Sequence, residues 1–406
     1  MKVTIVIPTY WRGPVKEAPL CTLESDYAYD HATSLDTDGT LARALESLGN
    51  LQGEDDFVVA VVAACTRQEI KQAVELKVQS IVARFDYDFP FLMIGPDELV
   101  LWRRRLAAAG FPQYDEFLNL DGYSNIRNMC LLAAILTRAD VAVLFDDDQV
   151  YEDPDYLQKA LEHIGREHDG RFVAGLAGWY AREDGDYRLP APRERWQRQW
   201  GGVKAMNEAF GLIDSEPRLK ETTFVFGGNM VIHRSLFETI PFDPRIPRGE
   251  DIDYLINARL FGFHFFLDSD LWIRHLPPPK CAPEWFRLRQ DIIRFSRERA
   301  KLATQQEGPG LVHVEAEELD PYPGRFLRDD FVDIVIGTSL EMATAYLARG
   351  QDRDAQECMV NIAIAKAENR IQDDPFNEYL EFQQRWAEFV QLAPEIKIWS
   401  PPSGTD

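Results

Sequence analysis

Short apolar runs alternate with helix-like spacing through the first 145 residues. A buried strand is indicated where β-branched and apolar residues run together, and a helix where apolar residues recur every three or four positions. By these criteria we predict strands at residues 3–7, 57–64, 78–85 and 141–145, and helices at residues 41–48, 67–76 and 124–136. Because alternating strands and helices are typical of a layered sheet, we predict an α/β fold.

The pattern changes near residue 280. Before this point we predict further strands at residues 172–176, 223–233, 263–267 and 271–275, and helices at residues 155–166 and 250–261. After three prolines at 277–279, long amphipathic helices are predicted at residues 283–302, 330–349, 352–369 and 375–392. We therefore predict two domains, residues 1–280 and a mainly helical C-terminal domain of residues 281–406.

Composition and charge narrow the class of protein. The chain has 406 residues, 45% hydrophobic and 27% charged, which excludes a disordered or collagen-like chain. Its net charge of −23 disfavours nucleic acid and anionic membranes, so an anionic ligand would need a local metal ion or arginine cluster. The apolar runs are shorter than the roughly 18 residues of a membrane-spanning helix, no secretory signal is recognisable, and the five cysteines form no C-x-x-C. We expect a cytoplasmic protein without a transmembrane segment, and leave a homo-oligomer open.

Three adjacent acids follow the predicted strand at residues 141–145. Asp146, Asp147 and Asp148 repel one another, and gathering them where a buried strand ends costs free energy unless a cation offsets it. Carboxylate oxygens suit Mg²⁺ or Mn²⁺, which also bind a diphosphate. The alternative is a solvated acidic turn that caps the next helix. Because ligands of α/β sheets gather at the carboxyl ends of strands, we favour a metal site.

Two further segments carry titratable side chains. Glu250, Asp251 and Asp253 open a predicted helix, where one acid is enough for capping, so another is left to act as a general base toward an acceptor hydroxyl. His275 ends a predicted strand. It is either a structural histidine or an imidazole that completes a metal site begun by carboxylates.

Other segments offer binding groups of weaker signal. Gly227-Gly228 permits close backbone approach to a ligand, and Asn229 offers a hydrogen-bond donor and an acceptor. The alternative is that the two glycines only mark a kink in a strand. At the start of the predicted helix at 124–136, Arg127 could meet an anionic group, and Asn128 could contact a ligand or cap the helix. Four aromatic side chains could stack on an acceptor sugar or belong to the core: Trp179, Tyr180, Trp196 and Trp200.

Taken in order, these segments resemble the family 2 glycosyltransferase pattern on a GT-A fold. The opening strand reads Ile-Val-Ile-Pro-Thr-Tyr at 5–10, the helix start Ser-Asn-Ile-Arg-Asn at 124–128, and the D-x-D motif lies at 146–148. An acceptor-side strand follows at 227–234, then Gly-Glu-Asp-Ile-Asp at 249–253, and a closing Ile-Arg-His at 273–275. The match covers about residues 3–280.

The resemblance implies a fold and a set of roles. The fold would be a Rossmann-like, mostly parallel central sheet flanked by helices, with a C-terminal helical extension. The reaction would move a sugar from a nucleotide-diphosphate-sugar donor to an acceptor hydroxyl on a sugar or small molecule, with Mn²⁺ or Mg²⁺ held by Asp148 and His275 and Asp251 as base. Asp146 would contact the ribose or the metal ion, and Glu250 or Asp253 is a less favoured base. The remaining implied positions are Pro8, Thr9, Tyr10, Arg127, Asn128, Asp146 and Asp147 toward the donor, and Gly227, Gly228 and Asn229 toward the acceptor.

Departures from the pattern keep alternatives open. Residues 63–66 lack the Asp that usually contacts the base, the segment at 11–40 is unusually long, and the Q-x-x-R-W motif of membrane-embedded synthases is absent. We favour an inverting hexosyltransferase. The alternatives are a retaining GT-A enzyme that makes a glycosyl-glycerate-type solute, a sugar-phosphate nucleotidyltransferase, and an inactive GT-A-like binding module. The nucleotidyltransferase would need a Gly-rich basic loop after the first strand. The binding module is disfavoured because Asp146, Asp148, Asp251 and His275 are all intact.

Overall fold

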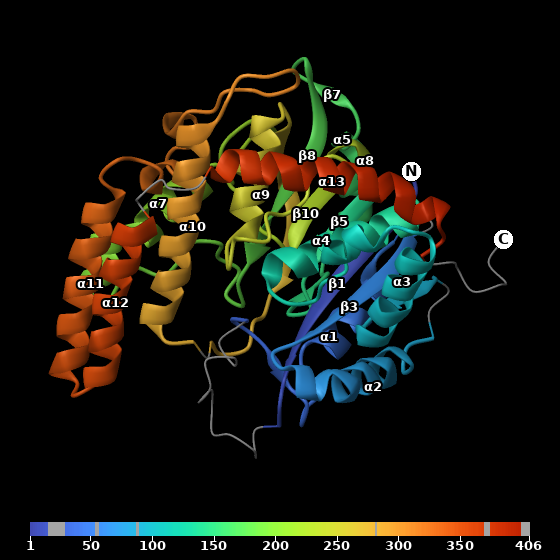
Figure 1. Cartoon of the computed structure of the whole chain (residues 1–406), viewed down its shortest axis with the longest axis horizontal. Helices are drawn as coiled ribbons and strands as arrows, with labels where there is room; N and C mark the ends of the chain where they lie inside the picture. Colours follow the sequence, from blue (N-terminus) through green and yellow to red (C-terminus); the bar gives the residue numbers. More distant parts are fainter. Residues whose placement is uncertain (15–28, 53–56, 87–88, 281, 369–373, 399–406) are drawn as a thin grey trace.

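The computed structural model describes residues 1–14, 29–52, 57–86, 89–280, 282–368 and 374–398, and confirms the predicted α/β fold (Figure 1). A central mixed sheet has the strand order β4-β3-β1-β5-β10-β8-β11-β6. Three short strands lie outside this order: β2 pairs with β1, β9 pairs with β11, and β7 pairs with β8. The strands are β1 Val3–Arg12, β2 Thr33–Ser34, β3 Phe57–Cys65, β4 Phe91–Ile94, β5 Val141–Phe145, β6 Gln149–Val150, β7 Glu167–His168, β8 Arg171–Ala181, β9 Leu219–Glu221, β10 Asn229–His233 and β11 His264–His275.

The pairing directions bring distant segments to one edge of the sheet. β4, β3, β1 and β5 are mutually parallel, β8 and β11 are parallel to each other, and β10 runs antiparallel between β5 and β8. Asn229 at the start of β10 therefore lies opposite Phe145 at the end of β5. β6 pairs antiparallel with β11, which places Gln149 opposite His275. The acids that follow β5, the glycines that precede β10 and the end of β11 thus share one edge.

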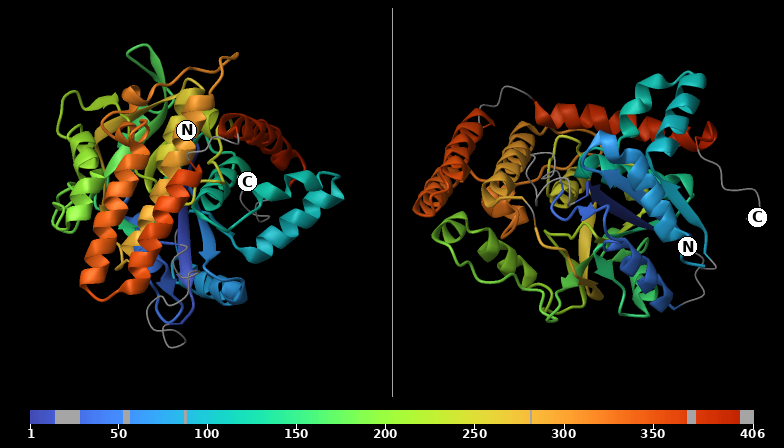
Figure 2. Two further views of the ribbon diagram at one scale, coloured as in Figure 1. Left: turned by 60° about the vertical axis from the view of Figure 1, so that its left-hand side comes forward. Right: turned by 90° about the horizontal axis from the view of Figure 1, so that it is seen from below.

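Helices cover both faces of the sheet (Figure 2). On β1, Val6 joins one hydrophobic cluster while Ile5 and Ile7 join another, as expected for a strand that is buried on both faces. The helices are α1 Leu41–Ser47, α2 Lys71–Val82, α3 Pro96–Ala108, α4 Tyr123–Leu136, α5 Tyr156–His163, α6 Arg195–Trp200, α7 Gly202–Phe210, α8 Arg234–Phe237, α9 Glu250–Leu260, α10 Glu284–Thr304, α11 Phe331–Ala348, α12 Asp352–Glu368 and α13 Pro375–Glu395.

Four of the predicted strands are wrong or misplaced. Residues 78–85 were expected to form a strand, but α2 continues to Val82 because Val74, Val78 and Ile81 recur at helical spacing on its buried face. The third parallel strand is β4, in a span to which the pattern assigned no strand. Residues 223–228 lie outside β10, and residues 263–267 and 271–275 belong to one long strand, β11.

The predicted C-terminal helical region is present, and it packs onto the rest of the molecule. α10 contacts α9, α12 and α13, α13 lies along α4, and α11 contacts α6 and α12 (Figure 1). Phe295, Phe326 and Trp386 belong to the same hydrophobic cluster as Val6 and Leu144. The helices after residue 280 therefore share a core with the sheet; the domain boundary itself stays a prediction.

One helix departs from the expectation drawn from apolar run lengths. By length and composition alone α11 is apolar enough to cross a membrane, although 44% of it is buried within this fold. The run-length criterion missed it because Asp333 and Glu341 interrupt the apolar sequence. In the structure α11 packs on α6 and α12.

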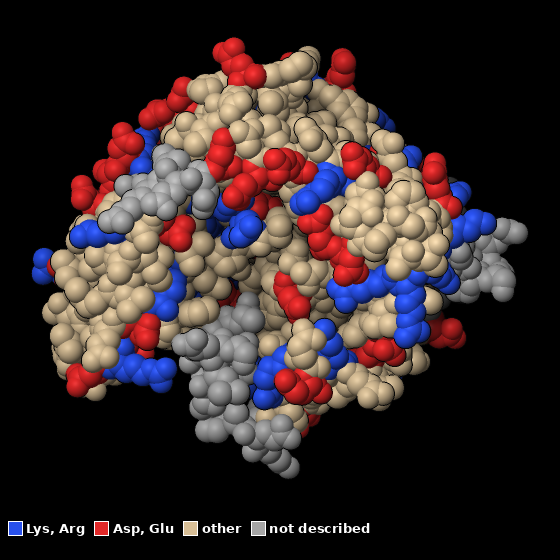
Figure 3. Space-filling view, in the orientation of Figure 1, with Lys and Arg blue, Asp and Glu red and all other residues tan. Residues whose placement is uncertain are grey.

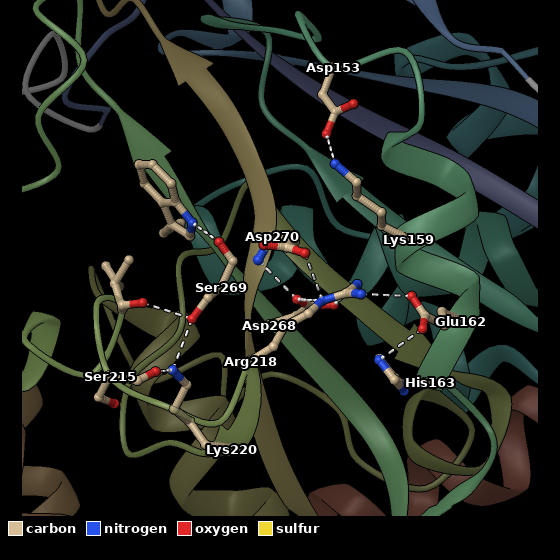
Figure 4. Close-up of polar contacts among 12 residues, drawn as sticks. Asp153, Lys159, Glu162, His163, Ser215, Arg218, Lys220, Asp268, Ser269 and Asp270 are labelled. Carbon is tan, nitrogen blue, oxygen red and sulfur yellow. Dashed lines mark hydrogen bonds and ion pairs between the residues drawn. The ribbon is translucent and has the colours of Figure 1, made fainter.

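A polar network fixes an irregular section of β11 (Figure 4). The register of β11 against β8 shifts between Leu267 and Trp272. Within this section the Arg218 guanidinium makes two hydrogen bonds, of 2.7 and 2.8 Å, to the fully buried Asp268 carboxylate, and a third of 2.9 Å to Glu162. Lys220 and the indole of Trp179 bond to Ser269. Because this section directly precedes Trp272–His275, the network helps to position His275.

Surface charge is unevenly spread (Figure 3). In this view acidic side chains dominate the upper surface, whereas basic ones gather at the right, where α3 lies. Helix α3 contains an arginine run at residues 103–105. Arg103 pairs with Asp115 at 2.8 Å, and Arg105 donates to the carbonyls of Lys397 and Ile398. This arginine run therefore anchors neighbouring segments of the fold.

Candidate active site

One cavity of about 330 Å³ lies at the sheet edge where β5, β8 and β11 end. It brings together most of the charged residues that the sequence singles out, from five separate segments of the chain. Its wall includes Tyr10, Arg127, Asp146, Asp147, Asp148, Glu250, Asp251 and His275. The predicted metal-binding, donor-side and catalytic acids thus share a single cavity.

Asp148 and His275 face each other in this cavity. Oδ2 of Asp148 lies 3.2 Å from Nε2 of His275. The backbone sets this pair, since Gln149 lies opposite His275 in the β6–β11 pairing and the Leu276 N–H donates to the Asp148 carbonyl at 2.9 Å. Burial alone would raise the pKa of Asp148, but the hydrogen bond and charge of His275 outweigh it and lower that pKa. Asp148 is therefore an ionised carboxylate beside an imidazole.

Asp146 has a different partner from the one predicted. The Arg127 guanidinium donates to both Asp146 oxygens, at 2.7 and 3.1 Å, and its Nε donates to Glu250 at 3.2 Å. Arg127 is buried, so this fork holds two carboxylates from distant segments in a site of low dielectric. An ion at Asp146 would have to compete with Arg127. The predicted role of Asp146 as a metal ligand therefore fits this arrangement less well than a role in binding Arg127.

The cavity offers few protein ligands for a divalent ion. Within the described residues, no group of three or more His, Cys, Asp or Glu side chains is arranged to hold a metal ion. Asp148 and His275 supply one carboxylate and one imidazole. Mg²⁺ is commonly bound through one or two carboxylates together with substrate phosphates, and an imidazole also suits transition metals. The pair thus fits an ion whose remaining ligands come from a bound diphosphate and water.

Among the three acids at the start of α9, Asp251 is the one whose carboxylate can still accept a hydrogen bond from a ligand in the cavity. Its Oδ2 accepts the Gly227 N–H at 3.0 Å and its Oδ1 accepts the Ile252 N–H at 2.9 Å, which leaves lone pairs for a further donor. Glu250 is held by Arg127, and burial raises its pKa. Asp253 is fully buried and bonds to Lys301 at 2.7 Å, so the structure argues against Asp253 as base.

The two glycines act by leaving room for this network. A Cβ on Gly227 would lie 2.6 Å from Arg127 Nη2, and one on Gly228 would lie 2.3 Å from Gln149 Nε2 and 2.6 Å from Asp146 Oδ2. Side chains at these positions would collide with the groups that hold the acids. The glycines therefore position the site, and neither is among the residues that line the cavity.

Four other predicted residues are used inside the fold. The Asn229 amide accepts from Tyr156 and donates to the carbonyls of Trp179 and Leu271, and the Asn128 amide forms a two-way pair with the backbone of Phe242. Thr9 donates to Asp147 at 2.6 Å, and Pro8 is buried within β1. Because these side chains are buried and already paired or packed, direct donor or acceptor contact by them has no support here.

The cavity also contains residues that the sequence did not single out. His31 lies near His275, with ring centroids 6.5 Å apart, and its Nδ1–H donates to the Pro278 carbonyl at 2.9 Å. Asp30 pairs with Arg248 at 3.2 Å, and these two charged groups lower the net cost of burying each other. The sequence feature that could have indicated Asp30 and His31 is the unusual length and the Asp- and Tyr-rich composition of the segment at 11–40. Residues 15–28 of this segment lie outside the described residues.

Of the four aromatics named from sequence, Tyr180 and Trp200 line the cavity. The Tyr180 ring lies against His275, with centroids 4.7 Å apart, and its oxygen accepts the Gly228 N–H at 2.8 Å. Trp196 is buried, and the indole of Trp179 donates to the Ser269 carbonyl.

Comparisons with known proteins concern the fold. No family model and no curated protein sequence matches the chain. Among solved structures, the mannosyltransferase PcManGT from Pyrobaculum calidifontis in complex with GDP-Man and Mn²⁺ is similar at 14% identity and a TM-score of 0.45, covering 97% of this chain and 86% of that one. A mycobacterial protein has 15% identity and a TM-score of 0.36, with 73% and 74% covered. GalNAc-T7 with UDP, GalNAc and Mn²⁺ has 11% identity and a TM-score of 0.36, with 85% and 58% covered.

Proposed function

We propose that this protein is a metal-dependent glycosyltransferase that uses a nucleotide-diphosphate-sugar donor. The observation that supports this is that the Asp148–His275 pair and Asp251 line the same cavity. Asp148 follows strand β5, His275 is the last residue of β11, and Asp251 lies in the first turn of α9. A site that couples departure of a diphosphate to deprotonation of a hydroxyl requires such groups within one ligand-sized space.

On the donor side, Asp148 and His275 would hold Mn²⁺ or Mg²⁺, which when bound neutralises charge on the leaving diphosphate. Arg127 keeps Asp146 and Glu250 ordered beside this position. Tyr10 lies in the wall with its hydroxyl buried and lacking a hydrogen-bond partner within the described structure, so a polar donor atom could satisfy it.

On the acceptor side, Asp251 would take the proton of the attacking hydroxyl. The two backbone N–H groups of Gly227 and Ile252 donate to its carboxylate and hold it in place. Direct attack by the acceptor hydroxyl on the face opposite the leaving group would invert the anomeric carbon. We therefore propose an inverting hexosyl transfer with Asp251 as base.

The test is hydrolysis of nucleotide sugars in the presence and absence of Mn²⁺ or Mg²⁺. We expect slow metal-dependent release of nucleoside diphosphate, lost in Asp148→Ala, with Asp153→Ala as a control aspartate outside the cavity lining. Release of pyrophosphate from a nucleoside triphosphate plus a sugar phosphate would instead identify a nucleotidyltransferase. Donor binding without turnover under any metal would contradict the proposal and leave a binding module.

A further inference from the structure

Part of the wall of the cavity that contains Asp251 is aromatic and aliphatic. Six side chains define this aromatic chamber: Trp200, Met206, Phe210, Phe226, Phe295 and Phe326. They come from α6, α7, the segment before β10, α10 and the short turn at Gly324–Phe326. The C-terminal helical region therefore contributes directly to the wall of the cavity that holds the candidate base.

The chamber walls are packed in advance of any ligand. Phe295 and Phe326 are stacked with centroids 4.5 Å apart and planes at 20°, and Trp200 lies 4.6 Å from Phe326. Phe210 and Phe226 form a separate ring contact, with centroids 5.1 Å apart. Phe210, Phe295 and Phe326 are almost wholly buried, whereas Trp200, Met206 and Phe226 keep part of their surface accessible. A ring or chain that enters would contact those three, with the buried rings behind them.

Most polar atoms of Arg294, beside this chamber, have partners already, and its Nε alone lacks a hydrogen-bond partner within the described residues. Arg294 donates to the Gly249 carbonyl at 3.4 Å, to Asp291 at 3.3 Å and to the Tyr322 hydroxyl at 3.1 Å. A sugar ring buried here would bring several hydroxyls with few free groups to bond them, and unpaired buried hydroxyls are costly. An apolar group has no such requirement and gains from leaving water.

We infer that the acceptor carries an aryl or alkyl group, which the aromatic chamber binds while the reacting hydroxyl lies at Asp251. This inference rests on the proposed glycosyl transfer and names the class of its acceptor. It disfavours a small, highly charged acceptor such as a glycerate, because the chamber would then be left without a ligand group to cover its apolar walls.

The test compares two ligands that differ in the apolar group alone, phenyl β-D-glucopyranoside and methyl β-D-glucopyranoside. Binding to the full chain is measured by ligand-observed NMR, without donor, so the readout is independent of turnover. We expect phenyl glucoside to bind at least tenfold more tightly than methyl glucoside. Met206→Glu, which puts a charge into the chamber, should abolish this difference. Met206→Leu should keep it, as should Met359→Glu, a matched change at a half-exposed methionine of α12.

Equal affinity for the two glucosides, binding of neither, or an unchanged difference in Met206→Glu would overturn the inference. Its failure is distinguishable from failure of the proposed function. If the wild type shows no phenyl preference but still shows metal-dependent donor hydrolysis, the chamber inference falls and the glycosyltransferase proposal stands. If instead the phenyl preference is found and donor hydrolysis is absent, the chamber stands and the glycosyltransferase proposal falls.

Discussion

At the scale of single residues, the site is organised by one buried arginine. Arg127 links Asp146, which follows β5, to Glu250, which opens α9. Without it two carboxylates would face each other in a cavity that already contains Asp147, Asp148 and Asp251. Its charge offsets part of the repulsion among these acids. From the sequence alone, a metal ion was expected to offset that repulsion.

We predict that Arg127→Met lowers the free energy of unfolding by about 3 kcal/mol, because it leaves buried carboxylates without their partner. Chemical denaturation at pH 7 measures this. The triple variant Arg127→Met, Asp146→Asn, Glu250→Gln should recover much of the loss, since it removes the stranded charges together with the arginine. A single variant as stable as the wild type would show that the fork contributes nothing to the fold.

A second residue gives stability a pH dependence away from the cavity mouth. Burial raises the pKa of Glu298 to about 8, although Arg294 and Lys301 lower it, and Asp253 and Asp291 add to the increase. Because the folded-state pKa lies above the unfolded one, the folded state binds the proton more tightly. Stability attributable to this group is therefore complete at low pH and is lost as the pH rises toward 8.

The variant Glu298→Gln cannot ionise at this position. We predict that its advantage over the wild type in free energy of unfolding grows by about 2 kcal/mol as the pH rises from 5.5 to 7.5. Thermal unfolding across this pH range measures the difference between the two proteins. A constant difference at every pH would mean that Glu298 does not titrate in this window.

At the scale of elements, the long strand β11 carries His275 to the cavity. Its irregular section is held by Arg218 on Asp268, and by Ser269 with Lys220 and the Trp179 indole (Figure 4). Two short strands were expected here because the polar Asp268, Ser269 and Asp270 interrupt the apolar pattern. Their pairing partners lie in other segments, and this is why the sequence does not reveal one continuous strand.

We predict that Arg218→Met destabilises the fold by about 2–3 kcal/mol, because Asp268 is fully buried and loses its charged partner. It should also weaken Mn²⁺ binding, since His275 follows this section. Arg325→Met, which breaks an exposed pair with Asp330, is the matched control and should change little. Denaturation and Mn²⁺ titration measure the two effects. Unchanged Mn²⁺ affinity in a folded Arg218→Met protein would contradict the positioning role.

At the scale of the whole molecule, local periodicity predicted the α/β class, β1, β3 and β5, and the long C-terminal helices. These signals lie within ten to twenty neighbouring residues. What it missed depends on contacts between distant segments: the Arg127–Asp146 fork, His31 and Arg248 in the cavity, and the aromatic chamber. The order of the motifs placed Asp148, Asp251 and His275 near one another by resemblance alone. Their actual partners could be seen only in the folded chain.

The central claim is that one cavity holds a metal-dependent donor site beside a separate base. Calorimetric titration of UDP and GDP, with and without Mn²⁺, combined with turnover of the matching nucleotide sugars, tests it most directly. We predict that one diphosphate binds with Mn²⁺, that Asp148→Asn loses this binding, and that Asp251→Asn keeps the binding but loses transfer by at least about a hundredfold. Mn²⁺-independent binding, or full transfer by Asp251→Asn, would contradict the account.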